Sequence, residues 1–138
     1  MTTNNRILLV EDNPDDITLT RRALKRHNFA NAMDVAHDGE EALARLFDPA
    51  QALPGVVLLD LHLPKVDGLE VLQRMRANSH TRHVPVVVLS SSDERRDVVS
   101  SYELGANSYV RKPVDFEQFL EVARQLGVYW LVLNLAPY

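Results

Sequence analysis

Short apolar runs alternate with segments of helical periodicity five times along this chain of 138 residues, and no other feature constrains its fold as strongly. The runs are bounded by turn residues, which predicts β-strands at 7–10, 33–36, 56–59, 86–89 and 108–110. Those at 7–10, 56–59 and 86–89 are apolar at every position, as is typical of parallel strands that helices cover on both faces.

Between these runs, apolar residues recur three or four positions apart, which places them on one face of a helix. Strict alternation of strand and helix implies right-handed crossovers onto one parallel sheet, so we expect an α/β domain without a linker or a second domain. The residues that mark the five helices are Ile17, Thr20 and Leu24; Ala42, Leu43, Leu46 and Phe47; Leu69, Leu72 and Met75; Val98 and Tyr102; and Phe116, Phe119, Leu120 and Ala123.

Residues typical of helix ends stand where the predicted helices should begin and end. Helices favour Asn or Asp as the first capping residue, proline just after it, and glycine just beyond the last turn. The predicted caps are Asn13 followed by Pro14, Asp38 with Glu41, Asp67, Asp115 with Gln118, and Gly105 at the end of the fourth helix.

The composition fits one ordinary globular domain and excludes several other classes of protein. Hydrophobic residues make up 46% of the chain, which is enough for a single core at this length. A net charge of -4 argues against nucleic-acid binding, and the basic residues at 21–26 are interpreted as a solvated helix face. The sequence has no cysteine, no signal-peptide pattern and no apolar run of the ~20 residues that span a bilayer, so we expect a soluble cytoplasmic protein.

Polar residues of several types follow the predicted strands. Glu11 and Asp12 come after the first strand, Asp60 after the third, Ser90 after the fourth and Lys112 after the fifth. In a doubly wound sheet the functional crevice lies outside the carboxyl ends of the strands, where strand order reverses. Three carboxylates, a hydroxyl and a lysine are therefore expected on one rim of the domain.

This combination of side chains predicts phosphoryl transfer to an aspartate. Clustered carboxylates repel one another, and a bound cation offsets that repulsion. Oxygen ligands without His or Cys favour Mg²⁺ or a similar hard ion. Lys112 adds a second positive centre for an incoming anion, and a carboxylate such as Asp60 can act as the nucleophile.

Four segments carry a resemblance to a known family: ILLVEDNPDD, VVLLDLHLPKVDG, PVVVLSSS and GANSYVRKP. In this order and spacing they resemble the receiver domains of response regulators, such as the chemotaxis protein CheY, over nearly the whole chain. The resemblance implies a doubly wound (βα)5 fold with strand order 2-1-3-4-5. It also implies one receiver domain over 1–138, with a core at about 5–126 and an apolar extension at 127–138. The EDNPDD opening and the late YWLVLNLAP segment are similar to small regulators that partner bacterial phytochrome histidine kinases.

The resemblance assigns roles to the strand-end residues. Asp60 would accept a phosphoryl group from a phosphohistidine of a sensor kinase, as part of a two-component phosphorelay. Mg²⁺ or Mn²⁺ would be bound directly by Asp12, Asp60 and the backbone carbonyl of His62, and through water by Glu11. Lys112 would act with Ser90 on the phosphoryl oxygens. The protein would thus promote its own phosphotransfer and autodephosphorylation without being a conventional enzyme.

Further residues match positions that couple phosphorylation to a change in shape. The hydroxyl of Ser90 and the ring of Tyr109 would form the switch, with a half-buried strand aromatic as the alternative interpretation of Tyr109. Phosphoryl lifetime would be tuned by His62 and Ser92. Gly68 is expected to serve backbone geometry, and the peptide bond before Pro113 is expected to be cis.

Three other functions compete with this interpretation. A haloacid-dehalogenase phosphatase needs a second acid two residues after its nucleophile, where this chain has His62. A flavodoxin needs a phosphate loop after the first strand, where Glu11 and Asp12 would repel a phosphate. A receiver-like module that binds proteins without phosphorylation remains the main alternative.

The end of the chain is apolar at consecutive positions from Val128 to Leu133. A helix that is apolar all round must be buried on more than one side. We therefore expect a homodimer through the fourth helix, fifth strand, fifth helix and tail; the alternatives are a tail folded onto its own domain or docked on a kinase or downstream protein target. The predicted interface residues are Tyr129, Trp130, Leu131 and Leu133.

Overall fold

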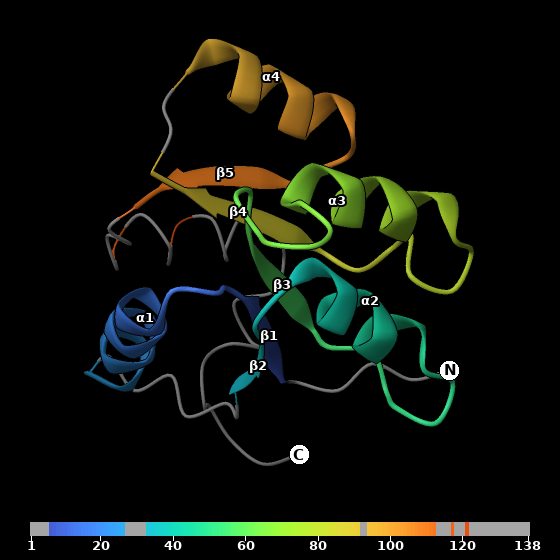
Figure 1. Cartoon of the computed structure of the whole chain (residues 1–138), viewed down its shortest axis with the longest axis horizontal. Coiled ribbons are helices and arrows are strands. Elements are labelled where there is room, and N and C mark those ends of the chain that lie inside the picture. The colour runs from blue at the N-terminus through green and yellow to red at the C-terminus, as the bar shows by residue number, and fades with distance from the viewer. Residues whose placement is uncertain (1–5, 27–32, 92–93, 113–116, 118–120, 122–138) are drawn as a thin grey trace.

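Five parallel strands form one sheet in the order β2-β1-β3-β4-β5, as the computed structural model shows (Figure 1). The structure describes residues 6–26, 33–91, 94–112, 117 and 121. The strands are β1 (Ile7–Val10), β2 (Met33–Ala36), β3 (Val56–Asp60), β4 (Val86–Ser90) and β5 (Ser108–Arg111). The helices are α1 (Pro14–Arg26), α2 (Gly39–Phe47), α3 (Gly68–Ala77) and α4 (Arg95–Glu103).

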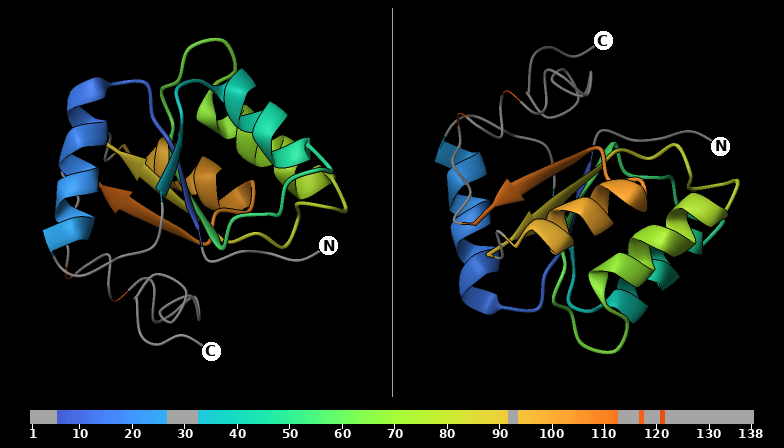
Figure 2. Two further views of the ribbon diagram at one scale, coloured as in Figure 1. Left: turned by 90° about the horizontal axis from the view of Figure 1, so that it is seen from below. Right: turned by 90° about the horizontal axis from the view of Figure 1, so that it is seen from above.

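The elements form three layers. Among the described helices, α1 covers one face of the sheet, and α2, α3 and α4 cover the other (Figure 2). Every residue of β1, β3 and β4 is buried, which confirms that these runs are apolar because both of their faces are covered. The predicted fold class and strand order are confirmed. The residues that mark the predicted fifth helix, and the whole of the tail, lie outside the described residues.

The strands β3 and β4 each extend one residue further than predicted. Asp60 pairs with Leu89 in the ladder, and Ser90 pairs with Arg111. Both polar residues are therefore the last members of central strands, where the ladder fixes their backbone.

Four of the predicted helix ends are confirmed. The side chain of Asn13 accepts hydrogen bonds from the backbone N–H groups of Asp15 and Asp16 at 2.8 and 3.2 Å. Asp38 caps α2 and Asp67 caps α3 in the same way. Gly105, with φ of 101°, ends α4 in a motif where the next residue donates back to the carbonyl of Ser101 at 2.9 Å.

Helix α4 is packed less deeply than its predicted apolar stripe suggests. Tyr102 is 48% exposed and Val99 is 41% exposed, whereas Ser101 is the buried residue of this helix. The Ser101 hydroxyl donates to the carbonyl of Asp97 at 2.7 Å, so its polar group is satisfied within the helix. The helix therefore presents apolar side chains on its outer surface.

Candidate functional site

Three carboxylates converge at the carboxyl ends of β1 and β3. One oxygen each of Glu11, Asp12 and Asp60 lies within 4.8 Å of the others. Glu11 and Asp60 are buried, at 2% and 6% exposure, while Asp12 is open to solvent. The three groups form a half-open acidic cup, and such a set of oxygen ligands fits a hard divalent cation.

The backbone around this cup is fixed by hydrogen bonds and by one glycine. Glu11 prolongs the β1–β2 ladder, because its N–H donates to the carbonyl of Ala36 at 2.9 Å. After β3, the chain turns back so closely that a Cβ atom on Gly68 would lie 2.2 Å from the carbonyl oxygen of Asp60. The N–H of Gly68 also donates to the carbonyl of Leu61 at 2.9 Å, which holds the turn.

Lys112 brings a positive charge to the same rim from the end of β5. Its ammonium group binds the carboxylate of Glu11, and its Nζ lies 3.5 Å from Oδ1 of Asp60. The backbone N–H of Lys112 donates to the carbonyl of Ser90 at 2.8 Å, so the β4–β5 ladder continues up to this residue. The lysine therefore contacts two of the three carboxylates of the cup.

Asp16 is a fourth carboxylate at this rim, and its position in the sequence did not indicate this. Its Oδ2 accepts a hydrogen bond from Nζ of Lys112 at 3.0 Å. It lies in the first turn of α1, and its side chain is 36% exposed. The acidic first turn of a helix is usually explained by the helix dipole, so the sequence carried no signal for this contact.

The environment shifts two pKa values in this site. Burial raises the pKa of the Asp60 carboxyl to about 6; Lys112 opposes this rise and Glu11 adds to it. Burial alone would lower the pKa of the Lys112 ammonium, but its hydrogen bonds to Glu11 and Asp16 hold that pKa above its usual value. Without a bound cation, the ionised form of Asp60 is thus unfavourable in the folded protein, and a nearby positive charge would stabilise it.

Ser90, Tyr109 and His62 are further predicted site residues that the structure describes. Ser90 is fully buried at the end of β4, and Tyr109 is half-buried in β5 against the core. The side chain of His62 is exposed. Ser92 and Pro113, together with the predicted interface residues Tyr129, Trp130, Leu131 and Leu133, lie outside the described residues.

The loop between β3 and α3 is fastened to the start of α2. Lys65 has φ of 67°, and its Nζ lies 3.5 Å from Oδ2 of Asp38. Gly39 lies so close to this loop that a Cβ atom on it would sit 1.8 Å from the carbonyl oxygen of Val66. The sequence did not reveal this contact, which holds the loop after Asp60 close to the start of α2.

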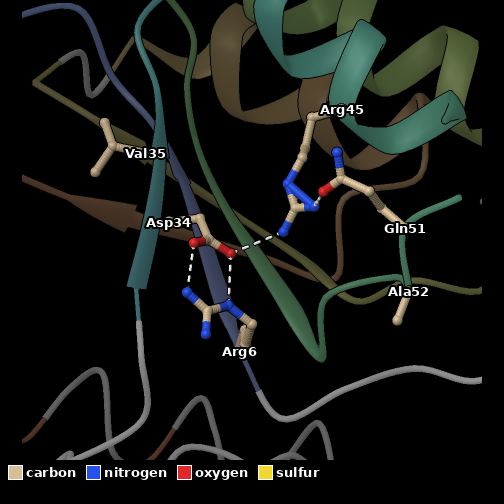
Figure 3. A pocket seen from close by; sticks show the side chains of 6 residues that line it. All are labelled: Arg6, Asp34, Val35, Arg45, Gln51 and Ala52. Atoms are coloured by element: carbon tan, nitrogen blue, oxygen red, sulfur yellow. Dashed lines mark hydrogen bonds and ion pairs between the residues drawn. The ribbon is translucent and has the colours of Figure 1, made fainter.

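A second polar cluster lies away from the cup, in a pocket beside β2 (Figure 3). Arg6 donates two hydrogen bonds to Asp34, at 2.6 and 2.7 Å, and Arg45 donates a third at 2.7 Å. The hydrogen bond from Arg6 is the largest cause that lowers the pKa of Asp34 to about 2. Since both guanidinium groups bind the same carboxylate, we interpret this cluster as a structural ion-pair network that links β2, α2 and the start of β1.

The chain belongs to the response regulator receiver domain family, which it matches over residues 7–124. The fold and the acidic cup agree with that family. No helix in the described part of the chain is long and apolar enough to cross a lipid bilayer.

The chain is similar to regulators associated with phytochromes. It is 52% identical to the bacteriophytochrome response regulator AtBRR, whose structure it matches with a TM-score of 0.84 over 96% of this chain and 99% of that one. It is 36% identical over 135 residues to the response regulator Rcp1 of Synechocystis, covering 95% of this chain and 92% of Rcp1. The crystal structure of the Mn²⁺-bound form of Rcp1 matches with a TM-score of 0.75 at 34% identity, over 96% of this chain and 99% of that one.

Proposed function

We propose that this chain is the phosphoacceptor of a two-component phosphorelay: Asp60 takes a phosphoryl group from a sensor histidine kinase, and the phosphorylated protein changes its contacts with other proteins. One observation carries this proposal. A buried carboxylate lies within reach of two further carboxylates and of a lysine, on a single rim of the fold.

In the proposed reaction an Asp60 oxygen forms a bond to phosphorus as the bond between phosphorus and the kinase histidine breaks. The carboxylate must be ionised to attack, and its pKa of about 6 is compatible with this near neutral pH. Mg²⁺ or Mn²⁺, when bound, would supply positive charge that offsets the negative charge of the site and of the phosphoryl oxygens. Asp12, Asp60 and the carbonyl of His62 would hold the ion, with Glu11 contributing through water.

Lys112 and Ser90 are the groups we assign to the phosphoryl oxygens. The ammonium of Lys112 lies 3.5 Å from the Asp60 carboxylate, so a modest movement would bring it to a phosphoryl oxygen. Ser90 ends the strand next to β3 and is fully buried, so its hydroxyl needs to move to reach the phosphoryl group. That movement would open space for the half-buried ring of Tyr109, and two conformers separated by a few kcal/mol suffice for such a switch.

The kinase partner that we propose is a bacterial phytochrome. The identities to AtBRR and Rcp1, together with matches that extend over nearly the whole of those proteins, support this assignment. The family match over residues 7–124 supports our proposal that residues 1–138 form one receiver domain. The output of this chain would then be protein contact, either with a downstream protein or with a second copy through α4, β5 and the segments that follow.

The principal test is intact-mass measurement after incubation with acetyl phosphate and Mg²⁺. The unmodified protein should gain the mass of one phosphoryl group, Asp60→Asn should gain none, and Asp15→Asn should behave like the unmodified protein. Asp15 is a suitable control because it is an exposed carboxylate in the first turn of α1. A folded protein that gains no phosphoryl mass, or an Asp60→Asn variant that gains it at the native rate, would contradict the assignment and favour the module that binds proteins without phosphorylation.

A further inference from the structure

Lys112 and a bound cation would compete for the same carboxylates. Its ammonium contacts Glu11 and Asp60, which are two of the three residues of the acidic cup. A divalent ion in the cup would draw these carboxylates to itself and repel the ammonium. This competition follows from the geometry of the cup and does not depend on a role of the ion in phosphoryl transfer.

The lysine cannot simply move into solvent without cost. Its side chain is only 14% exposed, and its backbone is held at the end of β5 by the hydrogen bond to Ser90. An ammonium that stays buried and loses its carboxylate partners is strongly unfavourable. Cation binding therefore requires another partner for Lys112 within reach of its present position.

Asp16 meets this requirement, because it contacts Lys112 without belonging to the acidic cup. Its Oδ2 lies 3.0 Å from Nζ of Lys112, and the cup consists of Glu11, Asp12 and Asp60. As a residue in the first turn of α1, it is carried by a different element from the strand ends that hold the buried carboxylates. A cation in the cup can thus attract Glu11 and Asp60 while the contact between Asp16 and Lys112 persists.

We propose that Asp16 is a positioning residue: it retains the ammonium of Lys112 when a divalent cation takes over Glu11 and Asp60, so that the cation and the lysine occupy the site together. The consequence for phosphoryl transfer rests on the proposed function. The effect of Asp16 on cation binding can be measured whether or not the proposed function is correct. Asp16 contributes a carboxylate within reach of the Lys112 ammonium, so Asp16→Glu should preserve most of its effect on cation affinity.

The experiment measures Mn²⁺ affinity from the loss of the free-ion electron paramagnetic resonance signal, at fixed pH and ionic strength. Asp16→Asn is compared with Asp15→Asn, which removes the same charge from the same helical turn; circular dichroism verifies that both variants are folded. We expect Asp16→Asn to weaken Mn²⁺ binding about fivefold, the scale of one partly exposed ion pair. Asp15→Asn should weaken it less than about twofold, since an exposed charge is screened, and Asp16→Glu should restore most of the lost affinity.

A double-mutant cycle with Lys112→Ala separates this role from a merely structural one. Without the lysine there is nothing for Asp16 to retain, so Asp16→Asn should then have no larger effect on Mn²⁺ affinity than Asp15→Asn. Equal effects of the two variants in the native background, or an Asp16→Asn effect that survives in the Lys112→Ala background, would overturn the inference. If Asp16→Asn does not fold, Asp16→Glu and Asp16→Ser are compared instead, and equal affinities would overturn it. Absence of phosphorylation in the native chain would defeat the proposed function and leave this result standing.

Discussion

Asp60→Asn is expected to stabilise the protein when no divalent cation is present. The native carboxyl is 6% exposed, and its burial raises its pKa to about 6, well above the usual value of an aspartate. This rise corresponds to at most ~3 kcal/mol, which is the free energy that ionised Asp60 costs the folded state at neutral pH. Asparagine has nearly the same volume and no charge, so it removes this cost and leaves Lys112 paired with Glu11 and Asp16.

The stabilisation should depend on pH in a specific direction. A carboxyl with a raised pKa binds its proton more tightly in the folded state, so its ionisation lowers stability as pH rises from about 4 to about 6. Below pH 4 the Asp60 carboxyl is protonated in both the folded and the unfolded state. Its charge then no longer distinguishes the native protein from the variant, and the two should have similar stability. Above pH 6 the difference should reach its full size of at most about 3 kcal/mol, or a rise in Tm of roughly 6 to 10 °C.

The assay is urea unfolding followed by circular dichroism, in a buffer with a chelator, at pH 4, 5, 6 and 7. Repeating it with Mg²⁺ should reduce or reverse the difference, because the ion binds the folded native protein better than the variant. Asp12→Asn provides a comparison, since that carboxylate is exposed and should give a smaller gain. A variant that is clearly less stable than the native protein at pH 7 without metal, or a difference that does not change with pH, would refute the reasoning.

Four further predictions concern other parts of the chain. Lys112→Ala should leave Mg²⁺ affinity unchanged or raised, measured by calorimetric titration, since a competing cation is lost; clearly weaker binding would mean that the lysine organises the acidic cup. Gly68→Ala should destabilise the protein by about 2 kcal/mol or more in urea unfolding, because its Cβ would meet the Asp60 carbonyl at 2.2 Å. Asp34→Asn should cost about 1 kcal/mol at pH 7, as expected of a partly exposed ion pair. Since the pKa of Asp34 is lowered to about 2, that loss should vanish as pH falls below 4 towards 2, and a loss that persists there would exclude the ion pair as its cause. Light scattering should show a dimer for the full chain and a monomer for a chain ending at Gly127, and a full-length monomer at tens of micromolar would contradict the proposed interface.

Much of the fold could be predicted from local patterns. The strands β1, β3 and β4 were recognisable because a strand buried on both faces is apolar at each position. Helix ends were recognisable because capping is a contact between residues two or three positions apart, as between Asn13 and the first turn of α1. The strand-end polar residues could be gathered into one site because parallel strands carry their carboxyl ends to the same rim.

Two strand ends and the burial of one helix were predicted less accurately. Asp60 and Ser90 were expected after their strands and are the last residues within them, since ladder pairing depends on the neighbouring strand. Tyr102 was expected on a buried stripe and is about half exposed, because the sequence pattern does not show how much of a helix its neighbours cover.

The sequence by itself therefore determined the class of fold, the family and the residue types on the functional rim, because each depends on local periodicity, turn chemistry or order along the chain. Only the tertiary structure decided which of those residues touch. The contact between Asp16 and Lys112 joins residues 96 positions apart, and the close approach of Gly39 to Val66 joins two separate turns. The raised pKa of Asp60 likewise depends on burial beneath several elements at once. Such properties are set by distances between segments in three dimensions, and a one-dimensional pattern carries no measure of those distances.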